Sequence, residues 1–373
     1  MRFLELEGLK KTPLYDCHVK YGGRVVDFGG WALSVQFKGI LEEHKAVRQR
    51  AGLFDVSHMG EVRVEGKGAL PFLQKLVSNN PSKLQKHQIQ YAHMLYPNGG
   101  VVDDLLVYRL GDEEFLIVIN ASNTVKDVAW MREVAARFAD VKLYDLSAAT
   151  AELALQGPLA LQILQRLTKT DLKPIKYYWC LPGVKFGRAT CLISRTGYTG
   201  EDGFEVFCTP EDGPALWDAI MDAGESDGLQ PIGLGARDSL RFEACMPLYG
   251  QELDDKTTPL EAGLGKYVDL DKPDFIGREP LLEQARKGLP KKLAGFEMVD
   301  RGIARSHFRV LREGNEIGYV TTGMFSPTLG KNIGLAYVPP ALAAVGNVFD
   351  VEVRGKPLQA RIVPTPFYRR PRR

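Results

Sequence analysis

Apolar positions along roughly the first three quarters of the chain follow two different spacings. Apolar residues three and four positions apart predict helices at residues 41–49, 69–77, 125–138, 215–223 and 236–246. Runs that alternate apolar and polar residues, such as residues 61–65, predict β-strands between them. Residues 27–31, which contain two adjacent glycines, are expected to form a loop. Helices and strands interleaved in this way predict an α+β fold for this part of the chain.

Turn residues divide several of the predicted strands into hairpins. Residues 97–100, Pro-Asn-Gly-Gly, are a strong turn signal before the run 101–110. A polar turn at residues 111–113 separates that run from residues 115–120, which predicts an antiparallel hairpin. Residues 189–195 and 204–208 predict a second hairpin, joined by the glycine-rich loop 196–203.

The pattern changes beyond about residue 278. Short alternating strands separated by turn residues are predicted at 293–297, 316–322, 333–338, 348–354 and 358–363. This pattern is typical of a small all-β sandwich or barrel. A domain boundary is therefore expected within residues 275–290.

The charge balance argues against a nucleic-acid-binding protein. The formal net charge is +2, and four arginines, at 369, 370, 372 and 373, lie in the last five residues. Without them the rest of the chain sums to 2 − 4 = −2. A basic tail on a nearly neutral body is not the basic face that binds nucleic acid.

Targeting signals and disulfide patterns are also missing from the sequence. The first residues include Glu5 and Glu7 without an apolar core for a signal peptide, and no apolar run approaches the roughly 18 residues of a membrane span. The five cysteines form no CxxC pair and are expected to be reduced, mostly buried thiols. We therefore expect a cytoplasmic protein with no membrane contact.

Motifs of several enzyme classes are absent from the sequence. There is no GxxxxGK[ST], GxSxG or HExxH, and the six histidines lack metal-ligand spacing. We therefore expect no metal site.

Two adjacent aspartates interrupt the apolar run 101–110. Aspartate is depleted in strands, and alternation places Asp103 and Asp104 on opposite, largely apolar faces. At least one carboxylate is then partly desolvated, which makes it a candidate for a shifted pKa and a catalytic role. The alternative is that both accept backbone N–H bonds from the preceding turn.

The loop 195–205 is the densest polar segment of the chain. Glu205 enters the following strand on the face opposite to Phe204 and Val206. Two interpretations stay open: a cross-strand partner of a surface lysine, or an acceptor of two parallel N–H donors from a flat heterocycle, which suits the two carboxylate oxygens.

Residues 233–238 begin a predicted helix with the sequence Gly-Leu-Gly-Ala-Arg-Asp. They lack the third glycine of a dinucleotide-binding fingerprint and a clear preceding strand, so this function is excluded. Arg237 lies in the first helical turn, where the helix dipole disfavours a cation. Either a salt bridge to Asp238 or Glu243, or an anionic or carbonyl-bearing ligand, would explain it.

In six ordered motifs the chain resembles the glycine cleavage T-protein family, and the resemblance extends from about Lys11 to Arg370. The motifs are residues 26–31, 52–60, 99–105, 194–205, 233–237 and 326–330. The resemblance implies a three-domain cloverleaf: an α+β lobe of residues 1–50 and 141–278, an inserted α+β lobe of residues 51–140 that carries the Asp103-Asp104 hairpin, and an all-β barrel or jelly-roll-like domain of residues 279–373 with the basic tail.

The resemblance also implies a function. The chain would be an aminomethyltransferase of glycine catabolism and one-carbon metabolism. It would transfer the methylene of the aminomethyl-lipoyl arm of H-protein to tetrahydrofolate and release ammonia. Two alternatives stay open: a folate-binding relative without transferase activity, and a folate-dependent demethylase of a small methylated compound.

Carried over from the family's motifs, individual residues acquire expected roles. Asp104 matches the essential aspartate beside the reacting nitrogens of folate, with Asp103 and Asn120 as neighbouring support. The expected folate-binding residues are Tyr91, Val118, Tyr177, Tyr198, Glu205 and Arg237, and Tyr178 is an alternative to Tyr177. Two positions depart from the family pattern: Phe367 stands where some relatives have tyrosine, and His93 replaces another residue.

Overall fold

The computed structural model describes residues 7–371, which form two compact units with interleaved segments. The first unit comprises the described residues up to Phe72, together with Lys83–Gln90 and Leu106–Leu240. The second comprises Leu73–Ser82, Tyr91–Leu105 and the described residues from Arg241 onward. The predicted three-part division of the chain remains a prediction.

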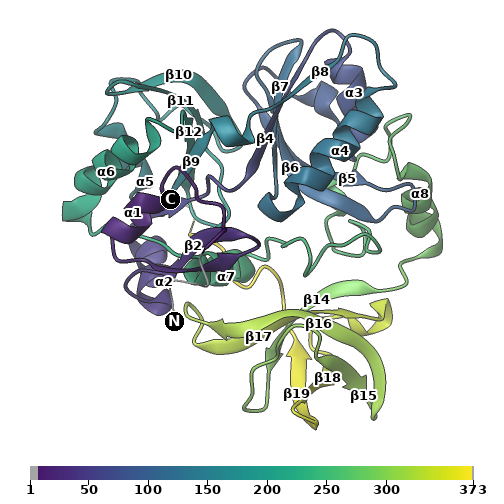
Figure 1. The fold of residues 1–373 in the computed structure, drawn as a ribbon. Helices are drawn as coiled ribbons and strands as arrows, with labels where there is room; N and C mark the ends of the chain where they lie inside the picture. The colour runs from purple at the N-terminus through teal and green to yellow at the C-terminus, as the bar shows by residue number, and fades with distance from the viewer. Residues whose placement is uncertain (1–6, 372–373) are drawn as a thin grey trace. The chain divides into compact units, whose positions relative to one another are not determined.

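A six-stranded sheet forms one layer of the first unit. Its order is β10 (Cys180–Phe186), β11 (Ala189–Ser194), β12 (Gly203–Cys208), β9 (Ala151–Gln156), β3 (Gly52–Asp55) and β13 (Gln230–Pro231). Helices α1 (Tyr15–Lys20), α5 (Ala160–Gln165) and α6 (Gly213–Gly224) contribute to the core on one face, around Trp217 and Phe204 (Figure 1). Helices α2 (Ile40–Gln49) and α7 (Leu234–Glu243) contribute Val47, Ala236 and Leu240 to the core around Phe54 and Ala154.

A five-stranded sheet has the order β5 (Ile89–Leu95), β6 (Val101–Arg109), β7 (Glu114–Ile119), β4 (Gly60–Glu65) and β8 (Lys142–Asp145). Strands β6 and β7 pair antiparallel with Leu106 opposite Val118, which confirms the predicted hairpin. Helices α3 (Ala69–Leu76) and α4 (Thr124–Ala135) belong to the same stretch of sequence. The division between the two units passes through α3, β5 and β6.

The predicted loop at residues 27–31 is wrong. Strands β1 (Arg24–Phe28) and β2 (Trp31–Gln36) form an antiparallel hairpin, and Phe28 pairs with Trp31. Only Gly29 and Gly30 form the turn, both with positive φ, at 59° and 87°. Two successive left-handed residues give the turn that matches the twist of a hairpin, and glycine adopts this conformation without strain.

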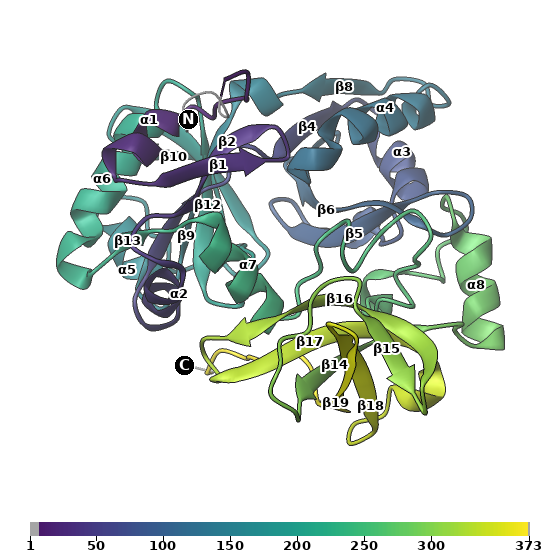
Figure 2. The same cartoon turned by 60° about the horizontal axis from the view of Figure 1, so that its bottom comes forward.

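The C-terminal part of the second unit is a closed six-stranded barrel, as predicted for an all-β segment (Figure 2). Its order is β14 (Lys292–Met298), β17 (Lys331–Val338), β16 (Asn315–Ser326), β15 (Arg309–Arg312), β18 (Val348–Val353) and β19 (Lys356–Ile362). Strand β15 was not predicted. Phe296, Val320 and Val351 fill the barrel core, and helix α8 (Arg278–Lys287) precedes the barrel.

A buried ion pair ties residues at the end of α7 to the barrel within the second unit. Arg241 Nη1 donates to Glu252 Oε2 over 2.8 Å, and both side chains are almost fully buried. The hydroxyls of Thr321 and Thr322 donate to the other oxygen of Glu252. The carboxylate is therefore saturated with donors, as a buried charge requires.

The motif at residues 326–330 is held by a second buried acid. Glu243, at the end of α7, accepts hydrogen bonds from the hydroxyls of Ser326 and Thr328 and from the Thr328 backbone N–H. The motif therefore anchors the β16–β17 hairpin to residue 243.

No helix among residues 7–371 is long and apolar enough to span a membrane.

Candidate functional site

Glu205 lies in β12 on the face that sequence alternation predicts. It pairs with Ala154 of β9 and Ser194 of β11, while Phe204 and Val206 point into the core on the other face. Its side chain is partly buried. Burial raises the pKa of Glu205, and the Thr196 hydroxyl and the Arg237 charge oppose that shift.

A chain of hydroxyl groups ends at Glu205. Thr196 Oγ1 donates to Glu205 Oε2 and lies 2.6 Å from Ser194 Oγ, which in turn lies 3.2 Å from the Tyr108 phenol. Tyr108 is fully buried, and burial followed by the charges of Glu205 and Glu152 raises its pKa well above the ordinary value. No residue between 7 and 371 donates a hydrogen bond to the second oxygen of Glu205, which leaves acceptor capacity for a ligand.

The glycine-rich loop 196–203 is fixed at both ends. Arg195 forms a two-pronged ion pair with Asp202, at 2.9 and 2.6 Å. Gln156 of β9 donates to the Thr196 carbonyl at 3.0 Å and accepts from the Thr199 hydroxyl at 2.9 Å. Arg48 of α2 donates to the Thr199 carbonyl at 2.7 Å. These contacts hold the loop in one conformation.

Arg237 and Tyr198, two of the residues expected to bind folate, contact each other. The Arg237 guanidinium lies 4.9 Å from the centre of the Tyr198 ring, a cation–π contact. The positive charge of Arg237 acts to lower the pKa of Glu205 and also that of Glu152. The salt bridges proposed from sequence to Asp238 or Glu243 do not appear among the ion pairs of the described residues. Among the described residues, the side-chain contact of Arg237 is therefore with Tyr198 and not with either acid.

The start of α7 is positioned by Glu43, which is fully buried. Its two oxygens accept backbone N–H groups from Phe37 at 2.7 Å, Gly39 at 3.0 Å and Gly233 at 2.7 Å. A Cβ at Gly233 would lie 2.5 Å from the Val35 backbone, so only glycine permits this approach. Gly233 and Gly235 thus serve close packing.

The motif at residues 52–60 contains a buried aspartate and a neutral histidine. Asp55 accepts from Thr12 at 2.6 Å and pairs with His18 at 2.8 Å. Burial alone would raise the pKa of Asp55, but the contacts with His18, Thr12 and the Ser57 N–H lower it overall. Burial, followed by the Arg237 charge, lowers the pKa of His58 to about 4. His58 is therefore neutral at pH 7.

Asp104 and Tyr91 are brought together in the second unit. The Tyr91 phenol donates to Asp104 Oδ2 over 2.8 Å. Tyr91 packs edge-on against Tyr267 and His93, at ring separations of 4.7 and 5.0 Å. Asp104 is partly buried, whereas Asp103 is fully buried on the opposite face.

A buried lysine supports the backbone beside Tyr91. Lys272 is 2% exposed, and its Nζ donates to the carbonyls of Val77 and Asn79 at 2.6 and 2.7 Å. The Asn79 amide donates to the Tyr91 carbonyl at 2.8 Å. Burial lowers the pKa of Lys272 to about 7 despite the opposing charges of Asp269 and Asp274.

The other predicted residues occupy varied environments. Val118 is buried against Tyr108 and Phe207. Tyr177 is 49% exposed and packs edge-on against Tyr178, which has a positive φ of 62°. The Asn120 carbonyl accepts from the Asn123 N–H at the start of a 3-10 turn.

Both departures from the family pattern have a packing role. Phe367 packs on Phe242, with a ring separation of 5.6 Å. His93 is fully buried, and burial lowers its pKa to about 3, so it is neutral.

Sequence reasoning missed two acids in the first unit. Glu61 of β4 is 1% exposed and Glu152 of β9 is 2% exposed. The available signal was a lone acid in the otherwise apolar run 151–155, which a buried strand would not tolerate without a reason.

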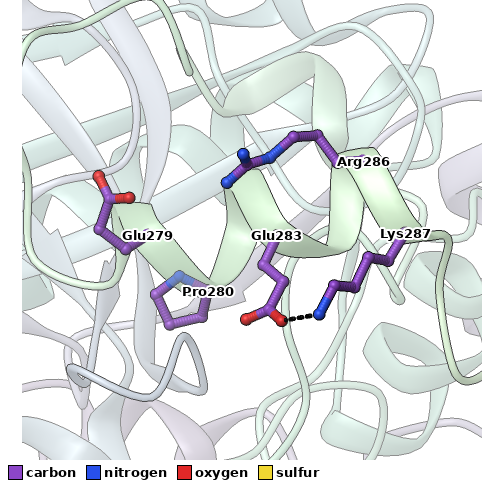
Figure 3. Close-up of a pocket in the computed structure, with 5 residues that line it drawn as sticks. All are labelled: Glu279, Pro280, Glu283, Arg286 and Lys287. Carbon is purple, nitrogen blue, oxygen red and sulfur yellow. Dashed lines mark hydrogen bonds and ion pairs between the residues drawn. The ribbon is translucent and has the colours of Figure 1, made fainter.

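Two surface hollows lie outside the predicted site residues. One, of about 440 Å³, is lined by Glu279, Pro280, Glu283, Arg286 and Lys287 of α8 (Figure 3). Glu283 and Lys287 pair with each other at 2.6 Å, and Arg286 points away from them. The other, of about 330 Å³, is lined by residues that include Phe186, Leu216 and Asp212. The first is lined almost entirely by charged side chains of one helix, and neither contains a predicted site residue.

No cluster of three or more potential metal-ligating side chains occurs between residues 7 and 371.

Two family models match the chain, one after the other. The GCVT N-terminal domain matches residues 14–272, and the glycine cleavage T-protein C-terminal barrel domain matches residues 291–369. The second match coincides with the closed barrel.

Full-length relatives agree with these matches. The chain is 57% identical to an aminomethyltransferase of Desulfitobacterium hafniense over 97% of this chain and 99% of the relative. It is 55% identical to an aminomethyltransferase of Geobacillus thermodenitrificans, with the same coverage. Among solved structures, the glycine cleavage system aminomethyltransferase T of Bartonella henselae is similar with a TM-score of 0.90 and 33% identity, covering 96% of this chain and 98% of that one.

Proposed function

The chain belongs to the glycine cleavage T-protein family and is an aminomethyltransferase, and we propose that tetrahydrofolate is its acceptor and the lipoylated H-protein its donor. The aminomethyl group on the lipoyl arm gives up its carbon to folate. Its C–N and C–S bonds break, and new C–N bonds form to N5 and N10. The hydrogens of N5 and N10 leave with ammonia and the lipoyl thiol, so the atoms balance. The reaction takes place in the cytoplasm.

The acceptor capacity of Glu205 carries the proposal. A pterin presents a ring N–H and an exocyclic NH₂ side by side, and a carboxylate accepts such a pair with its two oxygens. Thr196 donates to one oxygen, and no other residue between 7 and 371 donates to this carboxylate, which leaves acceptor positions for this fork. Arg237, lying over Tyr198, supplies a cation and further N–H donors for the carbonyl side of the ring.

Asp104 acts on the carbon that is transferred. As that carbon leaves sulfur or nitrogen it gains iminium-like positive charge, which a fixed carboxylate stabilises in a water-poor site. The hydrogen bond from Tyr91 fixes the orientation of that carboxylate. Tyr177, Val118 and Asn120 line or support the folate pocket, and no metal takes part.

Ammonia release that depends on both tetrahydrofolate and aminomethylated H-protein tests the proposal. Glu205→Ala should weaken tetrahydrofolate binding by about 1.5–3 kcal/mol, the usual range for a hydrogen bond to a charged group. Glu211→Ala, at an exposed position, is the matched control. Methyl transfer from a small amine in the absence of H-protein would instead support a demethylase. Unchanged folate affinity in Glu205→Ala would reject the assignment of Glu205 to the pterin ring.

A further inference from the structure

Glu61, Glu152 and Glu205 lie in one layer of the first unit, between its two sheets. Glu152 of β9 pairs with Phe207 of β12, and Glu205 of β12 pairs with Ala154 of β9. Glu152 and Glu205 are therefore diagonal neighbours on one sheet face.

Glu61 reaches the same layer from the other sheet. Glu61 pairs with Val118, which packs against Phe207. Side chains of directly paired residues share a sheet face, so Glu61 points toward the layer that holds Glu152.

Hydrogen-bond donors are missing around this pair. Three of the four carboxyl oxygens of Glu61 and Glu152 are buried and receive no hydrogen bond from an N–H or O–H of any residue between 7 and 371. The two carboxyls nevertheless lie within hydrogen-bonding reach of each other. Two carboxylates have no hydrogen to share, so this contact is a hydrogen bond only when one of the two is protonated.

The charges around the layer favour such a proton. Burial, then the neighbouring Asp145 of β8, raises the pKa of Glu61 to about 9. Burial also raises the pKa of Glu152, followed by the charges of Glu205, Glu61 and Asp55, with Arg237 alone opposing the shift. Asp55 is already paired with His18, and His58 is neutral. Among the described groups that act on the three glutamates, Arg237 is therefore the one cation, and it acts on Glu152 and Glu205.

Glu205 differs from the other two acids because it has a donor of its own. The Thr196 hydroxyl donates to it, and the Arg237 charge favours its ionised form. A proton in this layer is therefore favoured on Glu61 or Glu152 over Glu205.

We propose that Glu61 and Glu152 share one proton and act as a positioning pair for Glu205, setting the pH below which Glu205 stops accepting hydrogen bonds from a pterin ring. The ionised neighbour raises the affinity of Glu205 for a second proton. A protonated Glu205 has lost one acceptor position and cannot hold the donor fork. This role rests on the proposed function, in which Glu205 binds the pterin.

A purely structural role explains the pair poorly. Well-packed apolar side chains of similar volume are often as stable as a buried charged pair, or more stable. A buried acid pair without donors therefore lowers stability, and such costs are typical of functional sites.

The shared proton is tested by the pH dependence of unfolding, without folate. The folded state keeps a proton that the unfolded chain releases above its ordinary carboxyl pKa. The stabilisation present at low pH is therefore lost progressively until the pH passes about 9. The unfolding constant of the wild type, divided by that of Glu61→Gln, should rise about tenfold per pH unit between roughly pH 5 and 9. Glu211→Gln, an exposed control, should give a flat ratio.

A flat ratio for Glu61→Gln would overturn the proposal, because it would mean that Glu61 ionises alike in both states. Glu152→Gln should remove the same slope, and it replaces Glu61→Gln if that variant does not fold.

The link to Glu205 is tested by measuring tetrahydrofolate affinity as a function of pH. The affinity of each variant is divided by that of the wild type at the same pH, because ionisation of the ligand then cancels. Glu152→Gln removes the charge beside Glu205 and so lowers the pKa of Glu205. At about pH 5 this variant should therefore bind tetrahydrofolate about tenfold more tightly than the wild type, and near pH 8 the two affinities should agree within about twofold. In Glu61→Gln the new amide can still donate an N–H to Glu152. The pH below which tetrahydrofolate affinity falls should therefore change far less in this variant.

A ratio for Glu152→Gln that does not change with pH would contradict the positioning role. If the wild type bound no tetrahydrofolate, the proposed function would fail, and the folate-free unfolding measurement would still decide whether the proton is shared.

Discussion

The Tyr91 phenol donates a 2.8 Å hydrogen bond to Oδ2 of Asp104, and the two side chains belong to the same compact unit. Asp104 thereby has a fixed orientation, and the neighbouring Asp103 lies on the other face of β6. The pair allows the catalytic assignment to be tested at two atoms, the carboxylate and the phenol oxygen.

Asp104→Asn removes the charge while keeping shape and hydrogen bonding. We expect turnover to fall by about 10²–10³-fold, the scale for loss of one electrostatic catalytic group. Folate affinity should fall much less, because the charge acts mainly on the transition state. Methylene transfer from aminomethylated H-protein, measured beside a folate titration, provides both values. Asp103→Asn is the control and should lower stability rather than turnover. An equal loss of turnover in both variants would show that the wrong acid had been chosen.

Tyr91→Phe removes the hydrogen bond to Asp104 and leaves the ring packed on Tyr267 and His93. Turnover should fall by about tenfold, because a hydrogen bond to a charged group contributes about 1.5–3 kcal/mol and water can replace part of it. The melting temperature should change little. Tyr267→Phe keeps the ring contact and should retain wild-type turnover. Full activity in Tyr91→Phe would mean that Asp104 does not need this donor.

Arg241→Met leaves the buried Glu252 carboxylate without its cation. The unfolding free energy should fall by about 3–5 kcal/mol, the cost of breaking a buried pair by removing one partner. Chemical denaturation monitored by circular dichroism measures the change. Arg309→Met removes an exposed partner of Glu352 and should cost about 1 kcal/mol or less. Comparable losses in the two variants would contradict a stabilising role for the buried Arg241–Glu252 pair.

Lys272→Met removes a buried amine whose pKa is lowered to about 7 by burial. Between about pH 7 and the ordinary lysine pKa near 10.5, the unfolded chain binds a proton that the folded chain does not. The stability of the wild type relative to Lys272→Met should therefore rise with pH in this window. The unfolding constant of the wild type, divided by that of the variant, should fall by up to about tenfold per pH unit. The neutral amine still has two N–H donors for its two carbonyl partners. A pH-independent ratio would show that Lys272 stays charged.

Local patterns predicted the parts of the site that depend on one strand. Alternation placed Glu205 opposite to Phe204 and Val206, and it separated Asp103 from Asp104, because side-chain direction is set by the strand itself. Which aspartate is the more buried was not predictable, since burial depends on the elements packed on each face. The roles assigned to these residues remain predictions.

Non-local pairing explains what the sequence did not indicate. All six residues of β9 are buried, so the strand shows no alternation, and Glu152 acquires its neighbours only when β9 pairs with β12 and faces β4. The hairpin β1–β2 was missed for a simpler reason: two glycines suggested a loop, but two residues are all that a tight hairpin turn needs.

The interleaving of the two units limits how the protein can be divided or synthesised. The chain passes from one unit to the other after residues 72, 82, 90, 105 and 240. No single cut separates the units, and a fragment that starts at Arg241 lacks residues 73–82 and 91–105 of its own unit. During translation the first unit cannot be completed until residue 240 has left the ribosome. Residues 73–82 and 91–105, which are made before that point, therefore remain without the rest of their unit while more than 130 further residues are synthesised.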